Sequence, residues 1–313
     1  MLDDRERAHL LRGTPAPPRP GGRWEVPATV APWVAWVAAL AVAAQGFVRM
    51  LARPAADRLP DLHVYVTAVS SFVHGSSLYG LHGSLRSGFT YPPFAGLVLL
   101  PLAAVPQAVS RVGWTALTIL AAGGIALMVA RALPRRLGPV PFVWPALTAL
   151  VLVSKPFQSN LRFGQVSVFL TLAVLADAIA LDGHRWQGVL TGLAAAVKLT
   201  PLLFIPYLWL IGRRRAAALA ALVFAGASAV GFALLPHDSV AFWSSSLWHE
   251  SQGLPLAEGG NQSISAVLLR AGARGAALGL LWAGLCAAVG VLGLRRARRA
   301  WLGGQRLFSL AVV

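Results

Sequence analysis

The stretch APWVAWVAALAVAAQGFVRM, residues 31–50, decides the class of fold. It is a predominantly apolar run of the length that an α-helix needs to cross a hydrocarbon core of about 30 Å. Similar runs recur along the 313 residues, of which 57% are hydrophobic and only 12% charged, and the mean hydropathy is +0.65. Soluble domains carry about a quarter charged residues. The sequence therefore predicts an all-α, polytopic integral membrane protein.

About eight spans are expected. They cover residues 31–50, 92–105, 108–130, 141–153, 166–181, 188–211, 216–235 and an apolar run that ends near residue 294. The second and fourth are short for an untilted crossing. With the amino terminus inside, the two long polar interruptions, residues 53–91 and 236–261, both fall outside. The closing letters RLFSLAVV predict the start of another span, so the carboxyl terminus is expected to be incomplete.

The net charge of +16 comes from short basic clusters between apolar runs, at residues 131–136, 213–215 and 295–299. This pattern orients a membrane protein and meets anionic headgroups, and it is unlike the basic stripe of a nucleic-acid-binding surface. The last two clusters fall inside, whereas the first falls outside against the positive-inside rule. Residues 1–30 are expected to be a disordered cytoplasmic tail, and residues 31–313 one transmembrane domain.

The segment RLPDLHVYVTAVSSFVHGSSLYG, residues 58–80, opens the first external loop and carries one of the few carboxylates, Asp61. Its apolar residues recur at helical spacing and predict an amphipathic helix in the membrane interface, ended by Gly75. These residues are Leu62, Tyr65, Val69, Phe72 and Val73. Asp61 has two interpretations, an N-cap of this helix and a general base held at the membrane surface.

Lys198 lies inside the apolar segment AAAVKLTPLLF, residues 194–204, with Pro201 behind it. An ionisable group at membrane depth is costly and indicates function, here as the counter-charge of a phosphate. Snorkelling to the interface is the alternative. Pro201 leaves backbone carbonyls that need other partners.

Two polar patches adjoin spans, NLRFGQVS at residues 160–167 and GGNQSISAVLLR at residues 259–270. They offer neutral donors and acceptors suited to sugar hydroxyls, from Gln165, Asn261, Gln262 and Ser263. Arg270 is a second candidate phosphate contact, with interhelical packing as its alternative. His249 is a further candidate for substrate binding, although a solvated loop residue is the simpler interpretation. No nucleotide or metal-ligand motif occurs, and Cys286 is the single cysteine.

An ordered set of residues resembles glycosyltransferase family 87, the polyprenol-phosphate-mannose-dependent α-(1→2)-mannosyltransferases. The set is Asp61, Tyr65, Gly75, Tyr79, Tyr91, Pro92, Pro93, Pro101, Leu102, Gly164, Gln165, Lys198, Leu199, Thr200, Pro201, Asn261, Gln262, Ser263 and Arg270. The resemblance implies a C-type glycosyltransferase helical bundle whose first external loop carries the catalytic carboxylate, the place that Asp61 takes. It also implies that Tyr65 and Tyr91 belong to the substrate site.

The expected function is transfer of a sugar, mannose by resemblance, from a polyprenyl-phosphate donor to a glycolipid or glycan hydroxyl. Asp61 would act as general base in a single inverting displacement, with Lys198 or Arg270 at the leaving phosphate. The enzyme would lie in the plasma membrane with its site outside. No cofactor beyond the lipid-linked donor is expected, and the metal requirement stays open. The alternatives are a transporter or flippase for a lipid-linked sugar and a non-catalytic membrane scaffold.

Overall fold

The structure, a computed structural model, describes residues 31–54, 58–80, 88–247 and 261–313. Within these residues every regular element is helical, which confirms the all-α prediction. The longer helices are α2 (Ala31–Leu51), α3 (Pro60–Val73), α5 (Gln107–Ala132), α6 (Val140–Val153), α7 (Lys155–Phe163), α8 (Ser167–Leu175), α9 (Val189–Val197), α11 (Arg214–Leu234) and α15 (Gly275–Leu302). The shorter helices are α4 (Pro93–Leu99), α10 (Phe204–Leu210), α12 (Pro236–Ala241), α14 (Ile264–Arg270) and α16 (Arg306–Val312).

Four of the described helices are long and apolar enough to cross a membrane: α2, α5, α11 and α15. The pair α6 and α7 would make a fifth crossing if it counts as one span, but it bends by 64° where the helices join. Large apolar side chains stay exposed on these helices, for example Leu40 of α2 and Leu222 of α11. Exposed apolar surface of this kind is what lipid covers, so the chain is a multi-pass membrane protein.

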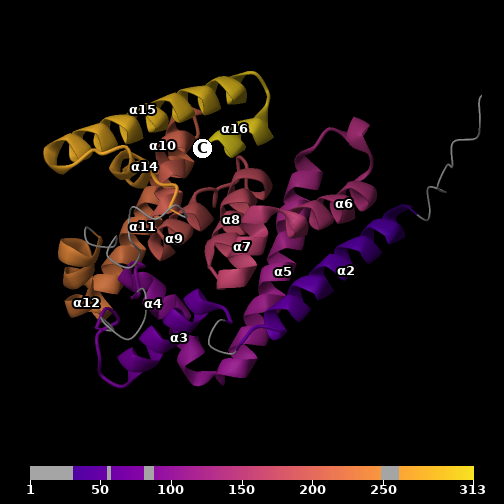
Figure 1. The fold of residues 1–313 in the computed structure, drawn as a ribbon. Helices are drawn as coiled ribbons and strands as arrows, with labels where there is room; N and C mark the ends of the chain where they lie inside the picture. The colour runs from indigo at the N-terminus through magenta and orange to yellow at the C-terminus, as the bar shows by residue number, and fades with distance from the viewer. Residues whose placement is uncertain (1–30, 55–57, 81–87, 248–260) are drawn as a thin grey trace, which may run out of the picture.

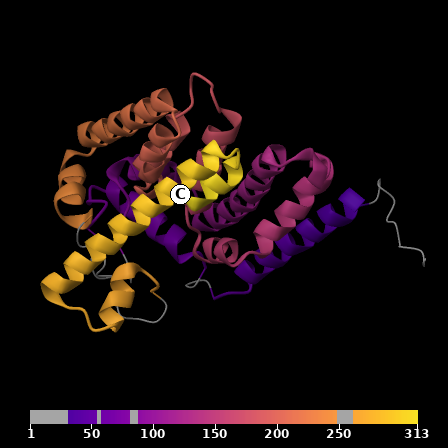
Figure 2. The ribbon, with the colours of Figure 1, turned by 90° about the horizontal axis from the view of Figure 1, so that it is seen from above.

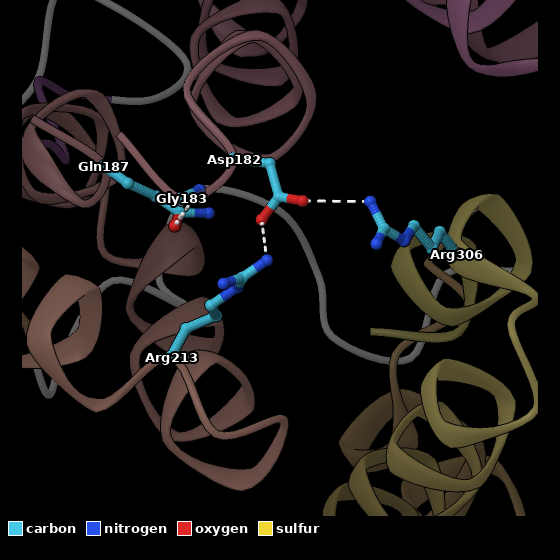
Figure 3. A network of polar contacts seen from close by, with 5 residues as sticks. All are labelled: Asp182, Gly183, Gln187, Arg213 and Arg306. Atoms are coloured by element: carbon cyan, nitrogen blue, oxygen red, sulfur yellow. Dashed lines mark hydrogen bonds and ion pairs between the residues drawn. The ribbon is translucent and has the colours of Figure 1, made fainter. Parts of the chain in front are cut away.

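The bundle has two ends that differ in content (Figure 1), and Figure 2 shows the same bundle from above. One end, called here the Asp61 end, holds α3, α4 and α12. The other, the Asp182 end, holds the turn after α8, the start of α11 and the start of α16. There the Asp182 carboxylate pairs with Arg213 at 2.6 Å and with Arg306 at 2.9 Å (Figure 3). Beside it the Gly183 amide donates to the Gln187 side chain, which closes the turn.

The expected span at residues 92–105 does not cross the bundle. It forms α4 followed by a 3-10 turn, Leu100–Ala104, and both elements pack against α3. The chain then starts α5 beside the same helix, where the Gln107 amide lies 2.9 Å from His63 Nδ1. Twelve helical residues extend only about 18 Å, which is too short to cross a hydrocarbon core of about 30 Å. The chain therefore returns to the side from which it entered.

Residues 188–211, expected as one span, form a helical hairpin. Helix α9 leaves the Asp182 end and stops at Val197, and Lys198 is extended with φ −148° and ψ 132°. A 3-10 turn, Thr200–Leu203, then starts α10, which returns the chain to Arg213. The Asp182–Arg213 ion pair joins a residue before the hairpin to one after it, so both ends of the hairpin lie at the same end of the bundle. Lys198 therefore lies at the tip of the hairpin and not in the middle of a helix.

Two glycines let α9 pack closely against α11. A Cβ at Gly188 would lie 2.2 Å from the Ala216 carbonyl oxygen, and a Cβ at Gly192 would lie 2.5 Å from that of Ala220. Small residues allow such backbone contact between membrane helices. The two contacts advance in the same direction along both helices, so α9 and α11 run parallel, as the hairpin requires.

The start of α9 is held by Asp177, which is 1% exposed. Its carboxylate accepts from the amides of Gly188 and Leu190 at 2.8 and 3.2 Å and from the Thr191 hydroxyl at 2.8 Å. The first amides of a helix lack partners within the helix, and a carboxylate supplies them. Asp177 is thus a structural residue at the Asp182 end.

Because residues 92–105 and 188–211 do not cross the bundle, the basic clusters are arranged differently from what the sequence predicts. Helix α5 runs parallel to α8, since Trp114 meets Phe169 and Gly124 meets Leu172. Residues 131–136 therefore follow α5 at the Asp182 end, together with the cluster that begins α11. The cluster of α15 is there too, because Arg298 Nε donates to the Leu210 carbonyl at 3.2 Å. Placing residues 131–136 opposite the other two clusters was wrong, because residues 92–105 do not cross.

Described parts of the two long interruptions contact each other at the Asp61 end of the bundle. Ser77, after α3, donates a hydrogen bond to the carboxylate of Asp238 in α12. Tyr79 stacks on Phe242 with ring centroids 5.9 Å apart. Phe242 is 1% exposed and belongs to the core.

Candidate functional site

Asp61 occupies the first turn of α3 but does not cap it. The N-cap position is Leu59, which makes no side-chain capping bond, and Pro60 takes the first helical position. The N-cap interpretation of Asp61 was therefore wrong. The amphipathic helix itself is confirmed, with Leu62, Tyr65 and Val69 buried and the chain turning at Gly75, where φ is 89°. Val73, expected on the apolar face, is exposed.

Leu59 is the one non-glycine residue in the described chain with a left-handed backbone, at φ 51°. Its side chain is buried and lies against Gly164, whose own left-handed turn ends α7. A strained residue persists only where its surroundings hold it, and such residues cluster at functional sites. Here the strain fixes the direction in which α3 starts, and thereby the position of Asp61.

Asp61 meets two of the predicted residues. The Gln165 side chain, just after the Gly164 turn, gives it a hydrogen bond, and the Lys198 ammonium lies close enough to act on its charge. Burial raises the pKa of Asp61 above its ordinary value of 3.8, while Gln165 and Lys198 oppose the rise. A half-buried carboxylate with a raised pKa is a stronger base than an exposed aspartate, and such groups are typical of functional sites.

Lys198 is positioned by the end of α9 and the start of α8. Its Nζ lies 3.2 Å from Ser167 Oγ and 5.4 Å from the centre of the Tyr91 ring. A cation above a tyrosine ring and beside a hydroxyl remains able to receive an anion. Ser167 lies in the polar patch of residues 160–167, but the sequence did not single it out; its place at the start of an apolar helix was the available signal.

Tyr65 and Tyr91 meet behind these charged groups. Their hydroxyl oxygens lie 2.8 Å apart, and the Tyr79 hydroxyl donates to the Tyr91 carbonyl at 2.7 Å. Burial raises the pKa of both Tyr65 and Tyr79. The phenols therefore stay protonated and act as hydrogen-bonding groups. The sequence placed Tyr65 and Tyr91 in the site, and the structure brings both next to Asp61 and Lys198.

Two cavities open at this cluster. One of about 250 Å³ is lined at its polar side by Tyr91, Lys198 and Thr200, and closed by Phe242 and Leu247 from the second long interruption. The other, of about 750 Å³, is apolar and runs from Ser167 and Thr200 toward Leu310 near the Asp182 end. A charged site at one end of a long apolar cavity matches an amphiphilic ligand with an anionic head.

The second polar patch, of residues 259–270, makes its described contacts within itself and with the helix that follows. Arg270 Nη1 donates to the Asn261 carbonyl at 2.7 Å, and the Asn261 side chain accepts from the Ser263 amide at 3.0 Å. Ser263 caps α14 by accepting from the Ala266 amide. Helix α14, which follows Gln262, packs on α15, and Arg270 is the last residue of α14. The structure thus does not bring this patch to Asp61, and His249 lies outside the described residues.

The fold and the site define an all-α, multi-pass membrane protein with a carboxylate, an amide and an ammonium group gathered where a polar and an apolar cavity meet. Among the described residues, no three His, Cys, Asp or Glu side chains gather as metal ligands would. The sequence model of glycosyltransferase family 87 matches residues 89–313. The chain belongs to glycosyltransferase family 87.

Curated relatives agree. A polyprenol-phosphate-mannose-dependent alpha-(1-2)-phosphatidylinositol pentamannoside mannosyltransferase of Mycobacterium tuberculosis is 32% identical over 260 residues, 81% of this chain and 59% of that protein. A polyprenol-phosphate-mannose-dependent alpha-(1-2)-phosphatidylinositol mannoside mannosyltransferase of Mycolicibacterium smegmatis is 31% identical, over 78% of this chain and 59% of its own length. The chain thus spans less than two thirds of these relatives. No solved structure matches it.

Proposed function

We propose that this chain transfers mannose from a polyprenyl-phosphate donor to a phosphatidylinositol mannoside. The observation that carries the proposal is the meeting of Asp61, Gln165 and Lys198 beside an apolar cavity. The donor and acceptor are those that the relatives' names print. Those names are of transferases, so they do not favour the alternative of a transporter.

The proposed reaction is a single displacement. The Asp61 carboxylate accepts the proton of an acceptor hydroxyl, and the acceptor oxygen forms a bond to the anomeric carbon of the donor mannose. The bond from that carbon to the phosphate oxygen breaks, and polyprenyl phosphate leaves with the electron pair. Lys198 stabilises the negative charge that grows on the phosphate, and Gln165 holds the carboxylate in place.

The cavities support the placement of the donor. A phosphate beside Lys198 Nζ would lie next to Ser167 and Thr200, which also line the mouth of the 750 Å³ apolar cavity. An isoprenoid chain is apolar and flexible, and such a cavity can hold part of it. The mannose would then occupy the smaller polar cavity beside Tyr91.

The side of the membrane follows from the basic clusters. All three lie at the Asp182 end, and the positive-inside rule assigns an end of this kind to the cytoplasm. Helix α2 also starts at that end and runs toward the Asp61 end. We therefore infer a site on the outer side of the plasma membrane, reached by lipid-linked substrates and without need of a nucleotide.

Transfer of labelled mannose from polyprenyl phosphate to phosphatidylinositol mannoside, in proteoliposomes, tests the proposal. Wild type should form product, and Asp61→Asn should lower the rate by about 10²- to 10⁴-fold. Asp61→Glu is the matched control, because it keeps a carboxylate at the same helix position and should retain part of the activity. Equal rates for wild type and Asp61→Asn, at equal protein levels, would remove Asp61 from the reaction.

A further inference from the structure

A second polar cavity, of about 390 Å³, lies at the Asp61 end between the last turns of α2 and the short helix α7. We call it the basic pocket. Its charged lining consists of Arg49 in the last turn of α2, Arg53 just after that helix, and Lys155 and Arg162 from α7, joined by the neutral side chains of Gln158 and Ser159. No aspartate or glutamate of the described chain lines it.

Within the part of the chain that the structure describes, none of the four cations forms an ion pair. Both ion pairs among the described residues use Asp182, at the opposite end of the bundle. Arg58, which is close in sequence, points elsewhere: its guanidinium donates to the carbonyls of Leu51 and Arg53 and so satisfies the end of α2. Four like charges around one cavity repel each other, and a bound anion removes that cost.

Apolar surface adjoins the basic pocket. Val48 and Leu51 of α2 are 61% and 44% exposed, and Val153, which lines the pocket, is 55% exposed. A cationic cavity at the end of a lipid-facing helix, beside exposed aliphatic side chains, suits the phosphate of a lipid better than a soluble anion. On the proposed topology this end is external, where the positive-inside rule gives no reason for arginine and lysine to gather.

The basic pocket and the Asp61 site share helix α7. Arg162 lines the pocket, and three residues later Gln165 gives its hydrogen bond to Asp61. Between them the Gly164 turn packs on Leu59 and Leu62 at the start of α3. Nine helical residues extend about 13 Å, so a ligand that spans a few sugar units can reach from the pocket to Asp61.

From this arrangement we infer that the basic pocket binds the phosphodiester of the anionic glycolipid acceptor and thereby holds the acceptor's sugar beside Asp61. The inference rests on the proposed transferase function. It assigns separate sites to the two phosphates of the reaction: the donor's at Lys198, and the acceptor's between α2 and α7. The acceptor's acyl chains would lie along the exposed face of α2.

The test uses the whole protein in nanodiscs and offers it two acceptor substrates. One is phosphatidylinositol mannoside, and the other is the same oligomannoside without phosphate or lipid. In the double variant Arg49→Gln/Arg53→Gln, we expect KM for the lipid acceptor to rise about tenfold or more. KM for the phosphate-free acceptor and kcat for both should stay unchanged. Arg185→Gln/Arg214→Gln, which removes two exposed cations at the Asp182 end, is the matched control.

An unchanged KM for the lipid acceptor, or an equal rise for both acceptors, would overturn the inference. If added phosphatidylglycerol returned the double variant's KM for the lipid acceptor to the wild-type value, the occupant would be a bystander phospholipid. That result would overturn the inference too. If wild type transfers no mannose, the proposed function fails separately. Native mass spectrometry of phosphatidylinositol mannoside retained by the protein then still tests the basic pocket. Loss of this lipid from the double variant but not from the control supports the pocket as its binding site. Equal retention by both variants refutes it.

Discussion

The Lys198 ammonium lies 3.2 Å from the Ser167 hydroxyl, so the tip of the α9–α10 hairpin meets the first residue of α8. This contact closes one side of the Asp61 site and opens onto the apolar cavity. It fixes the direction of the Lys198 side chain, whose ammonium points into the Asp61 site and does not snorkel along a helix surface.

Replacing Lys198 by methionine should lower kcat/KM for the polyprenyl-phosphate donor by about 10²- to 10³-fold, because the leaving phosphate loses its counter-charge. Methionine keeps an unbranched apolar stem, so the fold should survive. Ser167→Ala, which removes only the hydrogen bond, should cost about tenfold at most. Steady-state kinetics at equal protein amounts decide the matter. Failure of Lys198→Met to accumulate in the membrane would show a structural role instead.

The pH profile should report Asp61. Burial raises its pKa, and the base works only when ionised, so kcat/KM should rise with pH through an apparent pKa above 3.8. Lys198 favours the ionised form. Lys198→Met should therefore move this rise to higher pH, in addition to lowering the plateau. A rise that stays in place, or moves to lower pH, would contradict the proximity of the two groups.

The same raised pKa has a stability consequence. The folded protein holds the proton of Asp61 more tightly than the unfolded chain does. The free energy of unfolding should therefore fall as pH rises from the ordinary aspartate pKa toward the raised one. Asp61→Asn should remove this dependence. Thermal unfolding in detergent across that pH range, for both proteins, measures it; an identical slope in the two would show that Asp61 does not cause it.

The hairpin makes a topological prediction. Single cysteines at Arg185 and Arg215, in a Cys286→Ser background, should react with a membrane-impermeant thiol reagent from the same side, because residues 188–211 return the chain. A cysteine at exposed Ser76 should react from the opposite side. Labelling of intact cells and of inverted vesicles gives the sides. Opposite sides for positions 185 and 215 would restore a single crossing and refute the hairpin.

The structure brings together five of the residues that the sequence selected: Asp61, Tyr65, Tyr91, Gln165 and Lys198. Except for Tyr65, which lies inside α3, each lies at or just beyond an end of a helix, where polar groups are tolerated. Their roles in the reaction stay predictions. The hairpin was missed because its 24 residues are apolar and long enough to cross. Its signal was present in Lys198 and Pro201, a charge and a missing amide in mid-run, which together end α9 and start a 3-10 turn.

The patch at residues 261–270 shows the opposite limit. Asn261, Ser263 and Arg270 were chosen for their hydrogen-bonding chemistry, and the structure uses two of them to start α14. Ser and Asn before an apolar run satisfy helix amides as readily as sugar hydroxyls, so the residue types alone do not separate the two roles.

Asp177 and Asp61 should respond in opposite ways to substitution. Asp177→Ala leaves two amides and the Thr191 hydroxyl without an acceptor at the start of α9, which should lower the free energy of unfolding by on the order of 1–3 kcal/mol. Asp61→Asn should leave stability at neutral pH equal or higher while lowering the transfer rate by about 10²- to 10⁴-fold. Thermal unfolding and activity, measured together on both variants, separate a helix cap from a base. A stable but inactive Asp177→Ala would instead place Asp177 in the reaction.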